Sequence, residues 1–334
     1  MMNTGTLPII DLSACLSGSA ADGKMAADAI RRACEEIGFF LVSGHGVEET
    51  LIERTYASVK RFFDLPLDEK MQIARQSGAV SRGYDKLGGQ ALSKTLGVLA
   101  PPDLQEVFSF GPPQIGDTPY YREGYGTIHF APNLWPRHPA DFRANAESYY
   151  GAMVGLSGRL MRLFALALGL PEDFFGSRID RQISSIRFIN YPDQPDAPVP
   201  GQLRAGAHSD YGTLTILRIE DAPGGLQVQD RQGRWIDVGY VPGTFVVNIG
   251  DLMMQWTNDT WISTVHRVVN PTRDRGLGAR RISMVFFHQP NYDAEIACLE
   301  ACLSADRLPK YAPITSGAHW RAKNAASRAA KSIA

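Results

Sequence analysis

Short β-rich runs recur at close spacing through the second half of this 334-residue chain, and they restrict the folds that it can adopt. Glycine, aspartate and proline separate the runs, for example in the turn sequences DAPGG and DRQG. Regularly spaced short strands with turn signals indicate a sandwich or barrel rather than βαβ units. The runs cover residues 183–191, 213–219, 225–229, 234–238, 244–249, 264–269 and 281–287.

The first half of the chain has a different pattern. Apolar residues at helical intervals predict helices over residues 22–37 and 47–63, with a buried strand at 38–42 between them and a brief extended piece at 8–12. A longer helix is predicted from about residue 139 to 168. Residues 76–136 are rich in glycine, proline and tyrosine with weak periodicity, which favours a functional loop region that shapes a substrate entrance.

We expect one structural unit, because the sequence contains no internal repeat and no low-complexity linker. The prediction is a mainly β fold with flanking helices. Residues 1–136, including the irregular segment 76–136, would pack on a catalytic core. That core spans residues 137–300 together with its long supporting helix, and a polar, alanine-rich tail follows at 301–334.

Composition narrows the classes of partner. A formal charge of −1 gives no basic surface for nucleic acid, and no apolar stretch approaches the roughly 18 residues that span a bilayer. The start, MMNTGTLPIIDLS, lacks the features of a secretory signal, and four cysteines do not make a disulfide framework. These features predict a cytoplasmic protein; they do not indicate an oligomeric state.

The candidate metal ligands are His208, Asp210 and, 58 positions later, His266. Two imidazoles and a carboxylate form the set that holds ferrous iron on one triangular face, with positions left open for a cosubstrate and dioxygen. We expect His208 and Asp210 to stand at the start of a strand after Gly206, where residues i and i+2 point to the same side. His266 would reach the same point from a distant strand.

A third candidate feature is the strand predicted over residues 281–288. Period two places Arg281, Ser283, Val285 and Phe287 on one face of it. A guanidinium beside a hydroxyl over an apolar floor suits the distal carboxylate of a short dicarboxylic acid. The alternative for Arg281 is a buried salt bridge to an aspartate or glutamate. Zinc would also accept two histidines and an aspartate, although the arginine argues against a simple zinc hydrolase.

Several ordered motifs resemble those of the isopenicillin N synthase-like group of 2-oxoglutarate- and iron(II)-dependent oxygenases, over nearly the whole chain. The N-terminal part of that family is similar to LPIIDLS and CEEIGFFLVSGHGV. Its catalytic half is similar to the segments NYP, HSD, GGLQV, NIGDLMMQWTN, HRVVNP and RISMVFF. The resemblance implies a double-stranded β-helix, or jelly roll, with helices packed outside.

The resemblance also implies roles for individual residues. The iron ligands of the family correspond to His208, Asp210 and His266, and its 2-oxoglutarate anchors correspond to Arg281, Ser283 and Tyr191. Three departures stand out. Ile189 occupies a position where the family often has asparagine, residues 272–279 form an insert, and Arg-x-Ser also occurs in relatives that do not use 2-oxoglutarate.

The activity implied by the resemblance is oxidation of a small organic metabolite by hydroxylation, desaturation or ring formation, with consumption of O2 and release of succinate and carbon dioxide. A 2-oxoglutarate-independent iron oxidase like isopenicillin N synthase, a zinc-dependent hydrolase and a non-catalytic binding protein are the alternatives. The sequence does not identify the substrate. Candidate substrate contacts are Phe287 and Gln289, beyond Ser283 on the inward face, and Phe108, Phe110 and Tyr84 in the irregular segment.

Overall fold

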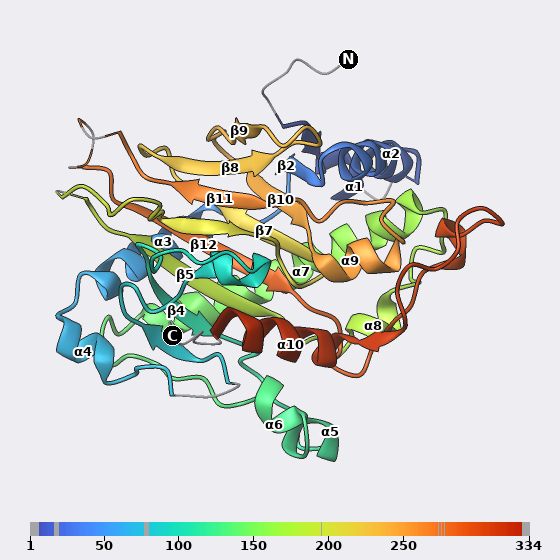
Figure 1. The fold of residues 1–334 in the computed structure, drawn as a ribbon. Helices are drawn as coiled ribbons and strands as arrows, with labels where there is room; N and C mark the ends of the chain where they lie inside the picture. The colour runs from blue at the N-terminus through green and yellow to red at the C-terminus, as the bar shows by residue number, and fades with distance from the viewer. Residues whose placement is uncertain are drawn as a thin grey trace.

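Two sheets form the centre of the molecule (Figure 1), and a computed structural model describes them within residues 7–16, 20–76, 80–194, 196–272, 274, 276 and 278–328. Within these residues, every pairing between the named strands is antiparallel except that of β1 with β2. The large sheet has the order β1 (Ile9–Asp11), β2 (Phe39–Ser43), β10 (Phe245–Ile249), β7 (Leu214–Arg218), β12 (Arg281–His288), β5 (Ser185–Tyr191), β4 (Glu106–Phe110) and β3 (Gly83–Asp85).

The smaller sheet faces the inward surface of the large one, and residues of both sheets line a common cavity. Its order is β6 (Ala205–His208), β11 (His266–Val269), β8 (Gly225–Gln229) and β9 (Trp235–Asp237). A separate pair joins β13 (Glu295–Ile296) to β14 (Ile314–Thr315). The β runs expected from the sequence between residues 183 and 288 all coincide with strands.

Helices surround the sheets. The long helix α7 (Phe142–Ala167) packs against α2 (Ala20–Glu36) and α3 (Glu49–Phe63) and lies behind the large sheet (Figure 1). The other helical segments are α1 (Ser13–Leu16), α4 (Leu67–Met71), η1 (Leu92–Leu96), α5 (Pro119–Arg122), α6 (Gly126–His129), α8 (Gly176–Ile179), α9 (Asp251–Trp256), η3 (Glu300–Cys302) and α10 (Ser316–Arg328). No helix within the described residues is both long enough and apolar enough to cross a membrane.

The large sheet has two distinct faces, and β12 shows the division. Ile282, Met284 and Phe286 point into the main hydrophobic core beneath α7. The alternate residues Arg281, Ser283, Val285 and Phe287 line the cavity between the sheets. The period-two pattern expected for this strand is therefore confirmed. One face of β12 packs in the hydrophobic core, and the other lines the cavity.

Three of the candidate substrate contacts lie on the wrong face. Phe108 is opposite Phe188 in β5 and Tyr84 is opposite Phe108, so the register places them, with Phe110, in the main core. Tyr84 is 2% exposed and its hydroxyl donates a hydrogen bond to Glu106. Phe108 and Phe110 pack against α7 and Tyr84 packs against α3. None of the three borders the cavities described below, so the expectation that they touch a substrate was wrong.

The irregular segment 76–136 is more ordered than its composition indicated. Outside residues 77–79, which are not described, it contains β3, η1, β4, α5 and α6. Strand β4 extends the large sheet beside β5, β3 follows β4 at the edge, and β2 joins the sheet beside β10. Strands from the first 136 residues thus share one sheet with strands of the second half.

Candidate functional site

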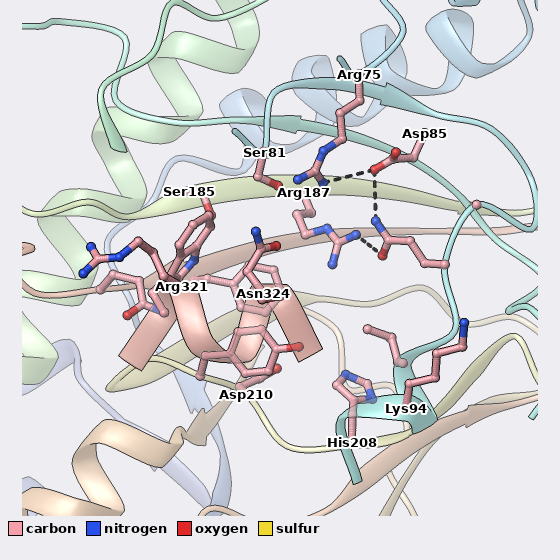
Figure 2. Close-up of a pocket in the computed structure, with 18 of the residues that line it drawn as sticks. Arg75, Ser81, Asp85, Lys94, Ser185, Arg187, His208, Asp210, Arg321 and Asn324 are labelled. Carbon is pink, nitrogen blue, oxygen red and sulfur yellow. Dashed lines mark hydrogen bonds and ion pairs between the residues drawn. The ribbon is translucent and has the colours of Figure 1, made fainter. Parts of the chain in front are cut away.

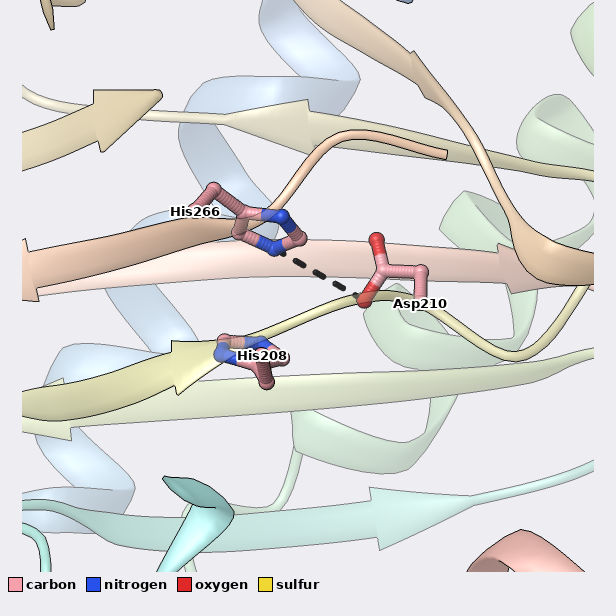
Figure 3. Close-up of side chains that lie close together, drawn as sticks. All are labelled: His208, Asp210 and His266. Carbon is pink, nitrogen blue, oxygen red and sulfur yellow. Dashed lines mark ion pairs between the residues drawn. The ribbon is translucent and has the colours of Figure 1, made fainter. Parts of the chain in front are cut away.

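Three side chains that are distant in sequence meet between the sheets (Figure 3). His208 is the last residue of β6, His266 is the first residue of β11, and the two are directly opposite in the register. Asp210 lies in the turn after β6, with its Oδ1 3.8 Å from Nε2 of His266. One ligand atom from each residue lies within 4.8 Å of the other two. The three side chains come together as expected. The expectation that His208 and Asp210 start a strand was wrong, because His208 ends β6 and Asp210 lies beyond that strand.

Hydrogen bonds orient both imidazoles. Nδ1 of His208 lies 2.7 Å from the carbonyl oxygen of Gly206, and Nδ1 of His266 lies 3.1 Å from that of Thr264. A carbonyl oxygen only accepts hydrogen bonds, so each Nδ1 carries the hydrogen. The lone pair of each ring is therefore on Nε2, which is the arrangement by which proteins prepare histidine for a metal.

The carboxylate of Asp210 is oriented in the same way. Its Oδ2 accepts hydrogen bonds from Thr215 Oγ1 at 2.6 Å and from Asn248 Nδ2 at 2.7 Å. Burial alone would raise the pKa of Asp210, but the neighbouring imidazoles and these two hydrogen bonds outweigh it and lower the pKa. Burial, followed by the adjacent His266, lowers the pKa of His208 to about 4. A carboxylate and a neutral imidazole are the protonation states that bind a metal.

An inner cavity connects this triad to the inward face of β12. Arg281 is 3% exposed, lies opposite Tyr191 in the register, and has Ser283 two residues further along the same face. Its guanidinium donates to the backbone carbonyls of Gly224 at 3.0 Å and Glu220 at 3.3 Å. The inner cavity is lined by the triad, Tyr191, Arg281 and Ser283, with Phe39, Ile189, Leu217, Leu226, Val268 and Val285 among its apolar walls.

The alternative of a buried salt bridge for Arg281 was wrong. Within the described part of the chain, Arg281 has no carboxylate oxygen within 4.0 Å, and its Nε has no hydrogen-bond partner. The carboxylate of Glu220 instead accepts hydrogen bonds from the Tyr56 hydroxyl and the backbone N–H of Ile282. A buried, unneutralised guanidinium next to a cavity is a site for an anion.

An outer cavity of about 790 Å³ opens on the other side of the triad (Figure 2). His208 and Asp210 border it, as do Phe287 and Gln289, the two substrate candidates on the inward side of β12. Phe287 also borders the inner cavity, so it lies where the two meet. Gln289 is 3% exposed and its Oε1 has no hydrogen-bond partner.

The sequence did not point to two walls of the outer cavity. Helix α10, which packs against η1, supplies Trp320, Arg321 and Asn324. Segment 85–94 supplies Gln90 and Lys94 among others. The composition of the tail was compatible with a helix, but nothing in the local pattern showed that this helix would cover a cavity formed by distant strands.

Fold and site together fit a non-haem iron oxygenase, and comparison with known proteins agrees. A model described as "non-haem dioxygenase in morphine synthesis N-terminal" matches residues 7–138, and the model of the 2OG-Fe(II) oxygenase superfamily matches residues 182–290. The chain belongs to the 2OG-Fe(II) oxygenase superfamily.

Individual relatives resemble almost the entire chain. It is 37% identical to the 2-oxoglutarate-Fe(II) type oxidoreductase hxnY of Emericella nidulans, over 92% of this chain and 86% of that protein. It is 34% identical to homoarginine-6-hydroxylase 2-ODD-233 of Oryza sativa subsp. japonica, over 94% of each. The crystal structure of a full-length Neurospora crassa protein in complex with alpha-KG and thymine superposes with a TM-score of 0.84, at 29% identity over 98% of each chain.

Family membership decides between the alternatives that the residues left open. The protein is a non-haem Fe(II)- and 2-oxoglutarate-dependent dioxygenase with a jelly-roll core, and it acts on a small molecule. Its cofactor is Fe(II), with 2-oxoglutarate as cosubstrate and O2 as oxidant. The zinc hydrolase, the 2-oxoglutarate-independent oxidase and the non-catalytic binding protein are not retained.

Proposed function

We propose that this enzyme oxidises a small organic metabolite at an iron ion held by Nε2 of His208, Oδ1 of Asp210 and Nε2 of His266. One observation carries the proposal: the second polar atom of each of these side chains is engaged by a hydrogen bond, and the remaining atom of each turns to a common point. Bound iron would couple the decarboxylation of 2-oxoglutarate to succinate and carbon dioxide with oxidation of the substrate.

For 2-oxoglutarate, we assign the distal carboxylate to Arg281, Ser283 and Tyr191. Arg281 offers donors that no carboxylate of the described chain occupies, and Tyr191 and Ser283 present hydroxyls on the same face of the sheet. The inner cavity joins these three residues to the triad, so the keto-acid end of the same molecule would face the metal. The apolar walls keep water from the charged groups, which strengthens their interaction.

The substrate would enter through the outer cavity and contact Phe287 and Gln289. Phe287 stands at the junction of the two cavities, where a ring packed against it lies beside the triad. The unpartnered Oε1 of Gln289 would accept a hydrogen bond from a substrate N–H or O–H group. These side chains would select the substrate and hold one of its C–H bonds beside the triad.

The organisation expected from the sequence is part of the same proposal. Residues 1–136, 137–300 and 301–334 would act as one structural unit in the cytoplasm. Pairing of β2 with β10 and of β4 with β5 supports the single unit. Four unpaired cysteines, Cys15, Cys34, Cys298 and Cys302, are compatible with a reducing compartment.

Anaerobic equilibrium dialysis tests the proposed function. We expect one Fe(II) to bind per chain, one 2-oxoglutarate to bind in an iron-dependent way, and a visible absorption band to appear when both are present. Admission of O2 should then release succinate. A product that has gained one oxygen atom indicates hydroxylation, whereas the loss of two hydrogens indicates desaturation or ring closure. Turnover without O2, or with zinc in place of iron, would refute the proposal.

Replacement of Thr215 tests the orientation of Asp210 separately. The change Thr215→Val keeps the shape of the side chain but removes the hydroxyl that holds Oδ2. We expect iron affinity to fall by about 10- to 100-fold, the usual cost of losing a partner of a metal ligand. Thr215→Ser retains the hydroxyl and is the matched control. Equal iron dissociation constants in the two variants would show that the hydrogen bond does not orient the carboxylate.

A further inference from the structure

Cationic side chains predominate around the outer cavity. Arg75, Arg82, Lys94, Arg187 and Arg321 all border it, whereas its carboxylates are those of Asp85 and Asp210. Arg75 pairs with Asp85 at 3.5 Å. In the described chain the other four cations have no carboxylate oxygen within 4.0 Å, and Asp210 belongs to the triad. A cavity with this balance favours an anionic occupant.

Among the cations of the outer cavity, Arg187 is the one that a strand of the large sheet supplies. It lies on the inward face of β5, opposite Val285 of β12. The adjacent row of the sheet contains Phe287 and Thr215, and Thr215 holds the carboxylate of Asp210. Arg187 borders both cavities. Figure 2 shows Arg187 among the side chains that line the outer cavity, together with Lys94 and His208.

A chain of contacts holds Arg187 in position without neutralising it (Figure 2). Asp85 pairs with Arg75 and accepts a hydrogen bond from Gln90 Nε2 at 2.9 Å. The Oε1 of Gln90 in turn accepts a hydrogen bond from Nη2 of Arg187. A neutral amide therefore stands between this guanidinium and the carboxylate, and the Nε of Arg187 has no hydrogen-bond partner.

We propose that the primary substrate is a small carboxylic acid whose carboxylate binds the guanidinium of Arg187, with Lys94 as a second cation and with the body of the molecule packed against Phe287. The planar fork of arginine matches a carboxylate with two parallel hydrogen bonds. The inference rests on the proposed function, because it takes the triad as the place where the substrate is oxidised. Arg187, Lys94 and Phe287, which would bind this acid, are not among the residues assigned to iron or to 2-oxoglutarate.

Binding of matched probes tests the proposal on the complete enzyme. The protein is held anaerobically with Fe(II) and saturating 2-oxoglutarate, so that the Arg281 site is already filled. Calorimetric titrations compare phenylacetate with its neutral isostere phenylacetamide and with the cation phenethylamine. We expect phenylacetate to bind at least about tenfold more tightly than the amide, as a hydrogen bond to a charged group implies.

Variants of Arg187 test whether this residue causes the preference for phenylacetate over the amide. Arg187→Met should reduce the affinity for phenylacetate to that for the amide, while Arg187→Lys, which keeps the charge, should retain part of the difference. Arg31→Met is the matched control, because Arg31 is exposed on α2, pairs with Glu35 on the same helix and does not line the outer cavity. We expect that change to leave all three affinities as in the wild type.

Several results would overturn the assignment. They are an amide or amine that binds as well as the acid, an acid preference that survives in Arg187→Met, or no binding of phenylacetate at millimolar concentration. The last result counts because an unneutralised guanidinium in a cavity should capture a small carboxylate in that range. Succinate formation by the wild type is measured separately. Its absence would reject the proposed function, whereas its presence without acid binding would reject only the substrate class.

Discussion

His208→Ala and Asp210→Ala should each leave the purified protein without stoichiometric iron and reduce succinate formation by more than about 100-fold. Loss of a residue that merely supports a ligand already costs up to about 100-fold, so loss of the ligand itself should exceed that value. Asp210→Ala also removes the only negative charge of the donor set, which leaves Thr215 and Asn248 without their acceptor. Metal analysis after gel filtration and a succinate assay measure the two effects.

Matched substitutions on the surface separate ligand loss from general damage. Asp196→Ala and His138→Ala change exposed residues of the same types, away from the cavities. We expect both variants to keep the iron content and turnover of the wild type. Full iron content with normal turnover in His208→Ala or Asp210→Ala would contradict the assignment of the ligands.

The triad could be predicted from the sequence because its chemistry is local. His-x-Asp keeps two ligands within reach of one atom in several backbone conformations, whether Asp210 follows in a strand or in a turn. The structure uses a turn, and the ligand atoms still converge. Strand β5 and strands β7 to β12 were also predictable, since alternation of apolar residues and the intervening turns are properties of short segments. Strand β6 was not among the predicted runs.

Which side chains of β4 point into the core was not predictable in this way. Shifting a strand by one residue exchanges its two faces, and EVFSF offers apolar residues to both. Only the pairing of Phe108 with Phe188 shows that the phenylalanines point into the core, while Val107 and Ser109 take the other face. Burial of Glu106 in this strand depends on an ion pair with Lys70 at 2.9 Å, a contact between distant segments.

The outer cavity depends even more on tertiary structure. Arg187, Lys94 and Arg321 come from β5, η1 and α10, and no local pattern connects them. Their common property, a charge without a carboxylate partner, exists only after folding brings them together. Candidates for the metal ligands and the 2-oxoglutarate anchors could therefore be predicted from the sequence, but the charge of the outer cavity could not.

Arg281→Met should raise the KM for 2-oxoglutarate by at least about 30-fold while the iron content stays at that of the wild type. Truncating one partner of a buried, charged hydrogen-bonded pair costs about 2–5 kcal/mol, and each 1.4 kcal/mol is tenfold in affinity. Methionine retains the apolar stem, so the packing of β12 is kept while the fork is removed. Initial rates of succinate formation at varied 2-oxoglutarate concentration give the KM.

The neighbouring Arg280 provides the control for this change. It precedes Arg281 in the chain, but its guanidinium pairs with Asp64 and donates to Asn190 outside the inner cavity. We expect Arg280→Met to leave the KM unchanged and Arg281→Lys to give a smaller increase than Arg281→Met, because lysine keeps the charge but not the fork. An equal KM in Arg281→Met and the wild type would contradict the assignment of the distal carboxylate of 2-oxoglutarate to Arg281. If Arg281→Met instead lost its iron, the triad and Arg281 could not be treated as separate binding sites for the metal and the carboxylate.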